Sequence, residues 1–118
     1  MFFEFDEVFW DNSVDLFNIF QDDWTLSVNC HKHNTGKPVL LMFNYGKQCV
    51  KFSTMGDDEV IASALAALKI MFPHAENLNP KSYLRTNWLK DKYAKMCYTY
   101  VPVGCSLQEF DILGQSIS

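Results

Sequence analysis

The strongest structural signal in the sequence is the stretch DDEVIASALAALKIMF at residues 57–72. Acidic residues fill its first turn, where the positive end of a helix dipole favours negative charge. Apolar residues then recur every three or four positions, which is the spacing of one helix face. The members of this stripe are Ile61, Ala64, Leu65, Leu68, Met71 and Phe72. Lys69 and Pro73 are typical of a helix C-terminus. We therefore expect one long helix, with Gly56 or Thr54 as its N-cap and the stripe buried.

On either side of this helix the sequence has the patterns of β-strands. Some segments alternate apolar and polar residues, and others are short apolar runs bounded by turn residues. Strands are expected at residues 2–5, 14–20, 24–29, 39–45, 82–88 and 97–101. Ser106 is a candidate cap for a final short helix over residues 107–113. The predicted fold is α+β: a mixed, mainly antiparallel sheet with the helix at 57–72 packed on one face.

Length and composition limit the protein to a few classes. The 118 residues fit one domain, and 48% of them are hydrophobic, which suits a folded core. Ten basic and 14 acidic residues give a net charge of −4, which argues against a general nucleic-acid binder. No apolar run approaches the roughly 20 residues of a membrane-spanning helix, so no membrane is expected as a partner.

The cysteines and the first residues of the chain bear on its compartment. The opening sequence MFFEFD has acidic residues where a signal peptide has cationic ones. The cysteines, at positions 30, 49, 97 and 105, form no CxxC pair. We expect an intracellular protein with reduced thiols. A disulfide pair in a secreted protein is the alternative.

Two kinds of polar cluster, one of cysteine and histidine and the other of acidic residues, are candidates for metal binding or catalysis. Cys30, His31 and His33 lie close enough in sequence to converge on one ion from a strand, but no carboxylate or second histidine pair has a matching spacing. The acidic groups at 22–23 and 57–59 have the composition of paired acids, but they fall in a turn and at a helix start. We expect no metal site and a structural role for the acids. The sequence has no GxGxxG, GxxxxGK[ST], GxSxG or HExxH motif.

Residues 88–100 are the segment that core packing explains least well. Trp88, Tyr93, Tyr98 and Tyr100 are interleaved with lysines and Asp91. A buried core favours phenylalanine, leucine and valine over so many tyrosines. Aromatic walls can hold an amine by cation–π attraction or can stack on a planar cofactor. The composition therefore predicts a binding role for this segment.

Short stretches spread over nearly the whole chain carry a family resemblance. They are FDEVFWD at 5–11, NCHKHNTGKPVL at 29–40, YG at 45–46, MGDDEV at 55–60, WLKD at 88–91, YTYVPVG at 98–104 and EFDIL at 109–113. In this order the sequence resembles part of a flavin-containing amine oxidase, the family of polyamine oxidases and lysine-specific histone demethylases. The resemblance also identifies His31 as part of a hairpin turn rather than a metal ligand.

The resemblance implies that residues 1–118 are a partial substrate-binding domain. The FAD-binding segments of the family, with a GxGxxG fingerprint upstream and a GExT segment downstream, lie outside it. The lysine that the family uses near the flavin would immediately precede Met1, so no catalytic residue is expected in the chain. The implied reaction is hydride transfer from an amine to FAD, followed by imine hydrolysis and peroxide release.

The expected partners are a small-molecule amine, most naturally of polyamine type, and the missing FAD-binding segments of the parent chain. The chain alone is expected to be inactive. By the resemblance, Trp88, Tyr93 and Cys97 bind the cofactor, with Trp88 near the flavin ring and Cys97 in the place of a serine. Tyr98 forms one wall of the cage that binds the amine.

The sequence departs from the family pattern DPxxRGSY, which here is DKYAKMCY at residues 91–98. Lys95 in the place of arginine loses a planar, five-donor group. Met96 fills a position where glycine gives the backbone room and conformational freedom. A non-catalytic module that binds a protein or peptide, or a degenerate paralogue, is therefore the alternative to an enzyme. A globular domain of unrelated role is a further alternative.

Overall fold

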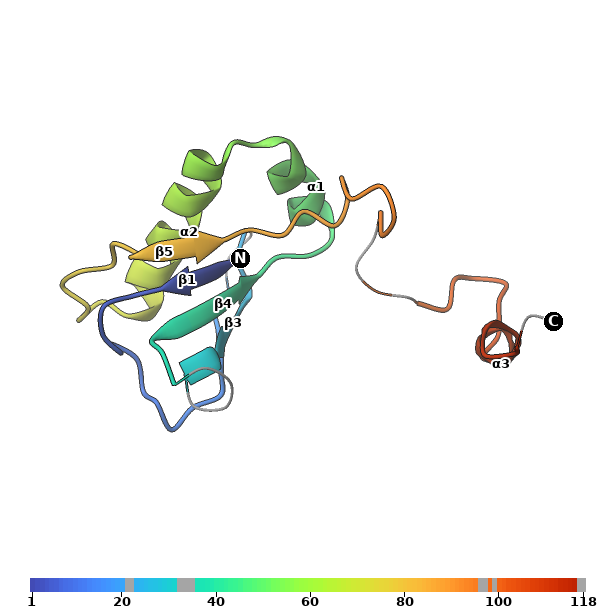
Figure 1. Cartoon of the computed structure of the whole chain (residues 1–118), viewed down its shortest axis with the longest axis horizontal. Helices are drawn as coiled ribbons and strands as arrows, with labels where there is room; N and C mark the ends of the chain where they lie inside the picture. The colour runs from blue at the N-terminus through green and yellow to red at the C-terminus, as the bar shows by residue number, and fades with distance from the viewer. Residues whose placement is uncertain (21–22, 32–35, 96–97, 99, 117–118) are drawn as a thin grey trace.

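The structure is a computed structural model that describes residues 1–20, 23–31, 36–95, 98 and 100–116. Within these residues a single sheet has the strand order β2-β3-β4-β1-β5, and every pairing is antiparallel (Figure 1). The strands are β1 (Phe2–Glu4), β2 (Leu16–Asn18), β3 (Leu26–Asn29), β4 (Val39–Phe43) and β5 (Ser82–Leu84). The helices are α1 (Lys47–Thr54), α2 (Asp57–Met71) and α3 (Gln108–Leu113).

Successive side chains on a strand point to opposite faces of the sheet, and on one face the side chains of the three central strands are buried. Phe3, Leu40 and Met42 lie on this face with Ser27 and Asn29, and each is at most 1% exposed. Helices α1 and α2 lie together on this side of the sheet (Figure 1). The core therefore lies between the sheet and these two helices.

Helix α2 contributes most of the helical side of the core. Its fully buried residues are Val60, Ala64, Ala67 and Leu68. From the predicted stripe, Ile61, Leu65 and Met71 are only half-buried, so the buried face is centred closer to Val60 and Ala67 than the spacing predicted. Gly56 is the N-cap, as expected, and its N–H donates to the Glu59 carboxylate at 3.1 Å. The helix ends at Met71, one residue before the predicted end.

Aromatic side chains bind the corner of α1 to the sheet. The ring of Phe52 stacks on Trp24 with centroids 5.0 Å apart, and both side chains are buried. The Trp24 indole N–H donates to the hydroxyl of Ser63 on α2 at 3.0 Å. Trp24, which precedes β3, thus contacts both helices. A second aromatic cluster in the core consists of Phe5, Phe9, Trp10 and Phe72.

The predicted α+β class is confirmed, but the sheet is antiparallel in every pairing among the described residues rather than mixed. The expectation of one long helix is not confirmed, because α1, which the sequence patterns did not indicate, accompanies α2. The strand predicted at 82–88 ends at Leu84, where the chain leaves the sheet. The strand predicted at 97–101 is wrong at Tyr98, Tyr100 and Val101, because this segment lies away from any strand with which it could pair (Figure 1).

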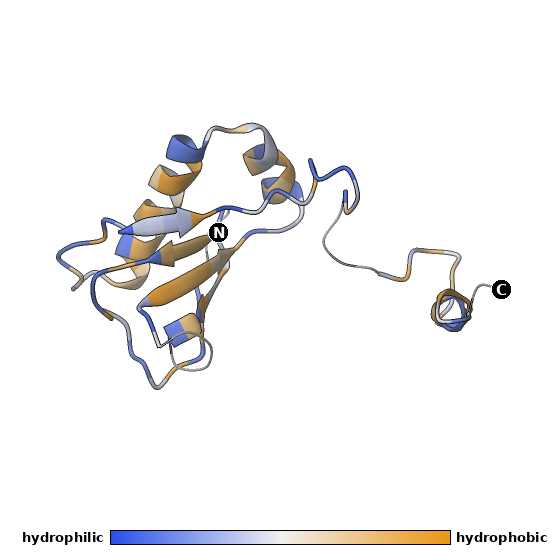
Figure 2. Cartoon of the chain, in the orientation of Figure 1, coloured by the Kyte–Doolittle hydropathy of each residue, from blue (hydrophilic) through white to orange (hydrophobic). Residues whose placement is uncertain are grey.

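The final segment extends away from the sheet and gives the molecule an elongated shape, 56 × 31 × 26 Å. The described side chains after Lys90 are all exposed, and α3 lies at the far end with several apolar side chains (Figure 2). The N-cap of α3 is Leu107, one residue after the predicted Ser106, and its side chain makes no capping hydrogen bond. Ser106 lies just before it: its hydroxyl accepts the N–H of Gln108 at 3.2 Å, and its own N–H and hydroxyl donate to the Glu109 carboxylate at 2.8 Å. No helix among the described residues is long and apolar enough to cross a membrane.

Candidate functional site

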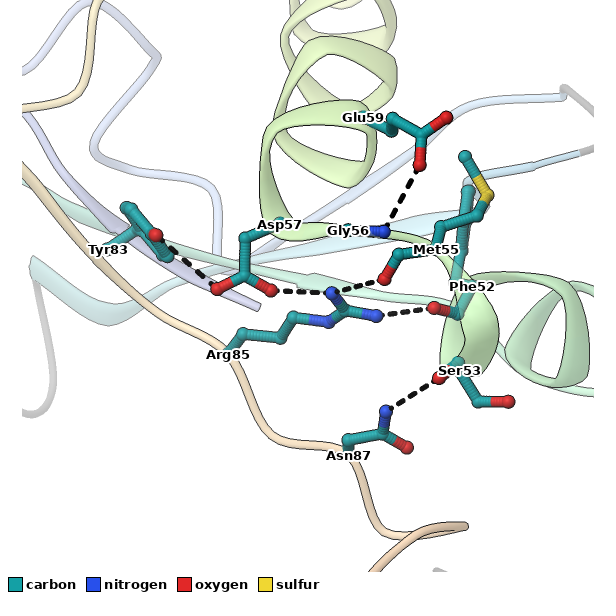
Figure 3. Close-up of polar contacts among 9 residues, drawn as sticks. All are labelled: Phe52, Ser53, Met55, Gly56, Asp57, Glu59, Tyr83, Arg85 and Asn87. Carbon is teal, nitrogen blue, oxygen red and sulfur yellow. Dashed lines mark hydrogen bonds and ion pairs between the residues drawn. The ribbon is translucent and has the colours of Figure 1, made fainter.

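The aromatic segment of residues 88–100 follows β5 and is fastened to the helices before its first aromatic residue. Arg85 donates to the carbonyl of Met55 at 3.1 Å and to the Asp57 carboxylate at 2.6 Å, and it also donates to the carbonyl of Phe52 (Figure 3). The side-chain amide of Asn87 donates to the carbonyl of Ser53 at 3.1 Å. These contacts attach the chain at residues 85–87 to the corner between α1 and α2.

Trp88 lies in a turn directly after this attachment. The carbonyl of Asn87 accepts hydrogen bonds from the N–H groups of Lys90 and Asp91, at 3.1 and 3.2 Å. The Trp88 side chain is 46% exposed. A half-exposed tryptophan leaves a large apolar ring face available for another molecule or another part of a protein.

Asp91 organises the next turn. Its carboxylate accepts hydrogen bonds from the N–H groups of Tyr93 and Ala94 at 2.9 and 2.8 Å, and these bonds lower the pKa of Asp91. Lys95 closes the turn in the left-handed region, with φ of 54°. Tyr93 is 86% exposed, and the ammonium group of Lys92 lies 4.6 Å from the centre of its ring. The ring therefore contacts a cation in the chain itself, as expected for its electron-rich face.

Tyr98, unlike Trp88 and Tyr93, lies at a cavity. It is 74% exposed and lines a cavity of about 530 Å³. Tyr100, Val101, Phe110 and Leu113 line the same cavity, and Lys95 and Glu109 add one charge of each sign. Trp88 and Tyr93 are not among the described residues that line it. Cys97, the fourth predicted site residue, lies outside the described residues.

The second face of the sheet is a further candidate surface, which the sequence patterns did not indicate. The strand register aligns one residue from each strand into a row across this face. The row, which we call the open apolar row, consists of Leu84, Phe2, Leu41, Val28 and Leu16. None of these side chains is buried, whereas Phe3, Leu40, Ser27 and Asn29 on the helix-covered face are. An apolar row of this length on an exposed face is typical of a surface that another element covers.

Only one sequence feature indicated that both faces of the sheet are apolar, namely the continuous apolar run at 39–45. That run predicts a strand covered on both sides. The structure covers one side with helices and leaves the other open. Which residues share the open face depends on the register between distant strands, so local patterns could not reveal it.

Among the described residues, no cluster of three or more histidine, cysteine, aspartate or glutamate side chains could hold a metal ion. His31 lies two residues after β3, and its N–H donates to the side-chain oxygen of Asn29 at 3.1 Å. His33 lies outside the described residues. Burial raises the pKa of the Cys30 thiol, so this cysteine is neutral at physiological pH.

Comparison with known proteins agrees with the family resemblance of the sequence. A family model described as flavin containing amine oxidoreductase matches residues 1–117. The chain is 30% identical over 119 residues to lysine-specific histone demethylase 1 homolog 3 of Arabidopsis thaliana, covering 97% of this chain and 7% of that protein. It is 28% identical over 123 residues to a possible lysine-specific histone demethylase 1 of Drosophila melanogaster, covering 96% and 13%.

A third relative carries a different activity in its name. The peroxisomal N(1)-acetyl-spermine/spermidine oxidase of Homo sapiens is 26% identical over 139 residues, covering 99% of this chain and 26% of that protein. The chain therefore spans between 7% and 26% of the length of these three relatives. The match over nearly every residue shows that the chain belongs to the flavin-containing amine oxidoreductase family.

Proposed function

We propose that residues 1–118 form part of the substrate-binding domain of an FAD-dependent enzyme that oxidises an amine. The observation that carries this proposal is the family match over residues 1–117. The same residues leave an apolar sheet face partly exposed and the described part of an aromatic segment exposed. Surfaces of this kind need a covering partner. The proposed partners are the FAD-binding segments of the parent chain, and the 118 residues alone are proposed to be inactive.

The exposed rings of this chain fit one wall of a site for a planar cofactor. Trp88 and Tyr93 present apolar ring surface to solvent, and neither is needed to fill the core. We assign them, together with Cys97, to the cofactor side of the site. When bound, FAD supplies hydride-acceptor and oxygen-reduction chemistry, so that the amine leaves as an imine for hydrolysis and peroxide is released.

Tyr98 is assigned to the amine side of the site. Its ring, with the apolar residues around it, removes water from the amine, and desolvation favours the neutral form that can be oxidised. Before the proton is lost, the electron-rich ring faces attract the ammonium form. The role of this chain is therefore to bind and orient the amine and to exclude water.

The substrate class has two candidates. A polyamine-type amine is the first, and it is supported by the human relative, whose name is that of an acetyl-spermine/spermidine oxidase. A methylated lysine side chain of a histone is the second, and it is supported by the relatives named as histone demethylases. An intracellular location is part of the proposal, since the name of the human relative describes it as peroxisomal.

The test is to express the longest reading frame that contains these residues and to measure peroxide release. The amine panel contains spermine, an acetylated polyamine and a peptide with a methylated lysine. We expect peroxide with at least one of them. Replacement of Tyr98 by alanine should lower kcat/KM for that amine by roughly tenfold or more, because the amine loses its orienting wall. The same replacement at Tyr45, an exposed tyrosine outside the aromatic segment, is the matched control.

A purified protein without flavin absorbance and without peroxide release would contradict the proposal. That result would favour the alternative, a non-catalytic interaction module or a degenerate paralogue. The residues that depart from the family pattern, Lys92, Lys95, Met96 and Cys97, are the specific reason to keep this alternative as an outcome.

A further inference from the structure

We propose that Arg85 is a positioning residue: together with Asn87 it fixes the start of the aromatic segment, the turn that carries Trp88, against the corner between α1 and α2. This inference rests on the proposed function, because it assigns Arg85 a role in placing residues that face the cofactor and the amine. Nothing in the sequence patterns singled out Arg85, which is the only arginine in the chain.

The contacts of Arg85 join three elements at one point. Its guanidinium group donates to the carbonyls of Phe52 and Met55, which end α1, and to the carboxylate of Asp57, which begins α2. The last carbonyls of a helix carry the negative end of its dipole. The Phe52 carbonyl also accepts the N–H of Met55 at 3.1 Å, so Arg85 adds a second donor to it. A planar cation with several donors binds both carbonyls and the Asp57 carboxylate at once, which a single ammonium group does not.

The surface to which Arg85 is attached belongs to the rigid core. The Arg85 side chain is 13% exposed, so its contacts are largely shielded from water. Phe52, whose carbonyl it binds, is buried and stacks on the buried Trp24. Met55 packs against the same core. A shift of Arg85 would therefore have to disturb well-packed residues.

Asn87 transmits this fixed position to Trp88. Residues 85 and 87 are two positions apart on an extended chain and so point to the same side, where both donate to carbonyls of the α1 end (Figure 3). The backbone carbonyl of Asn87 then accepts the two N–H groups that form the turn around Trp88. One residue thus holds the helix with its side chain and begins the Trp88 turn with its backbone.

The experiment follows the indole N–H signals of the 118-residue chain by NMR. The chain has three tryptophans, and the Trp88 signal is assigned from its loss in Trp88→Phe. In Arg85→Gln we expect the Trp88 signal to move toward that of a free tryptophan and its heteronuclear NOE to fall. The Trp10 signal, at the other end of the core, should not change. Asn87→Ala should produce the same change to a smaller degree.

Two further variants separate positioning from charge. Lys90→Gln removes one positive charge from the same segment. Among the described residues the Lys90 side chain makes no hydrogen bond or ion pair, so the Trp88 signal should stay as in the parent. Arg85→Lys keeps the charge but loses the planar fork, so it should not restore the signal. The inference is overturned if Trp88 is unchanged in Arg85→Gln and Asn87→Ala, or if Trp10 and Trp88 change together, which would indicate general loosening.

This readout requires neither flavin nor amine, so it can fail independently of the proposed function. In the longer protein, Arg85→Gln should lower kcat/KM for the amine by roughly 10- to 100-fold with the flavin still bound, as expected for a misplaced wall. A changed Trp88 signal in a protein that releases no peroxide would overturn the proposed function, and with it the part of the inference that concerns the amine. A changed Trp88 signal with unchanged kinetics would overturn the role in catalysis.

Discussion

Leu68 lies on the buried side of α2 and has no exposed surface. Replacement of this residue by alanine should lower the free energy of unfolding by about 2–5 kcal/mol, because transfer energy is lost and a cavity remains. Leu68→Asp should be more severe, since it adds an unpaired buried charge. Urea denaturation followed by circular dichroism measures the loss.

Ile70 provides the control for Leu68 on the same helix. It is 59% exposed, so Ile70→Ala should change the free energy of unfolding by no more than about 0.5 kcal/mol. Equal losses in the two variants would mean that α2 does not pack on the sheet through the face described. Leu65, which is half-buried, should give an intermediate loss.

Tyr83 on β5 contacts α2 through its hydroxyl, which donates to the Asp57 carboxylate at 3.3 Å. The negative charge of Asp57 is the main reason that the pKa of Tyr83 lies above its ordinary value of 10.0. Because the folded chain raises this pKa, the contact stabilises the fold while the phenol is protonated. That contribution is present below pH 10 and is lost as the pH rises through the folded pKa.

Replacement of Asp57 by asparagine should therefore move the pKa of Tyr83 back toward 10.0. Ultraviolet titration of tyrosinate formation, with Tyr83→Phe to identify the signal, measures the shift. Asp111→Asn removes one negative charge from the distant α3 and should leave the titration of Tyr83 unchanged. An unaltered Tyr83 titration in Asp57→Asn would show that the contact does not form in solution.

Single residues differ in how well the sequence predicted them. Leu68 was predictable because helical spacing alone places it on the apolar side of 57–72. Arg85 was not, because its importance comes from three acceptors that are far away in sequence and meet only in the fold. Trp88, Tyr93 and Tyr98 were selected by residue type, and their assignment to cofactor and amine stays a prediction.

At the scale of elements, the two glycines that begin the helices differ in backbone conformation. Gly46 caps α1 with φ of 63°, a region that side chains rarely adopt, whereas Gly56 caps α2 with φ of −68°. No atom lies within 4 Å of a Cβ placed at Gly46, so only the backbone opposes a substitution there. Gly46→Ala should lower the free energy of unfolding by about 1–3 kcal/mol, because its φ of 63° with ψ of −137° is a combination that residues with a side chain rarely adopt.

Gly56→Ala is the matched control for this glycine. A Cβ at position 56 would meet only the Glu59 carboxylate at 3.8 Å, which is an ordinary contact. The expected change is within about 0.5 kcal/mol in thermal or chemical unfolding. A loss at position 56 that equals the loss at 46 would indicate that α1 does not begin with a left-handed residue.

Helix α2 was predicted and α1 was missed for a physical reason. The sequence of α2 contains acidic first-turn residues, a long stripe and a terminating proline, which all agree. The sequence of α1 has few apolar residues at helical spacing, and only Phe52 is buried. A helix of 8 residues is marginal by itself, so α1 depends on tertiary contacts such as the Trp24 stack and the Arg85 bonds. Tertiary contacts also explain why β5 ends earlier than predicted. After Leu84 the side chains of Arg85 and Asn87 bind carbonyls of α1.

At the scale of the whole molecule, two exposed surfaces distinguish this chain from a closed domain. The open apolar row crosses all five strands, and the segment after Lys90 extends away from the sheet (Figure 1). Composition predicted a folded core, and the structure has one. It did not predict that so much apolar surface stays outside that core, because surface exposure depends on topology rather than on content.

The most direct test of the central claim is the visible absorbance spectrum of the protein made from the longest reading frame that contains these residues. The spectrum is recorded without oxygen, before and after addition of the amine that gives the most peroxide, or of spermine if none does. The account predicts bound flavin whose absorbance is lost on addition of the amine, at a rate that falls in Tyr98→Ala and is unchanged in Tyr45→Ala. A protein that carries no flavin, or flavin that no amine reduces, would contradict it.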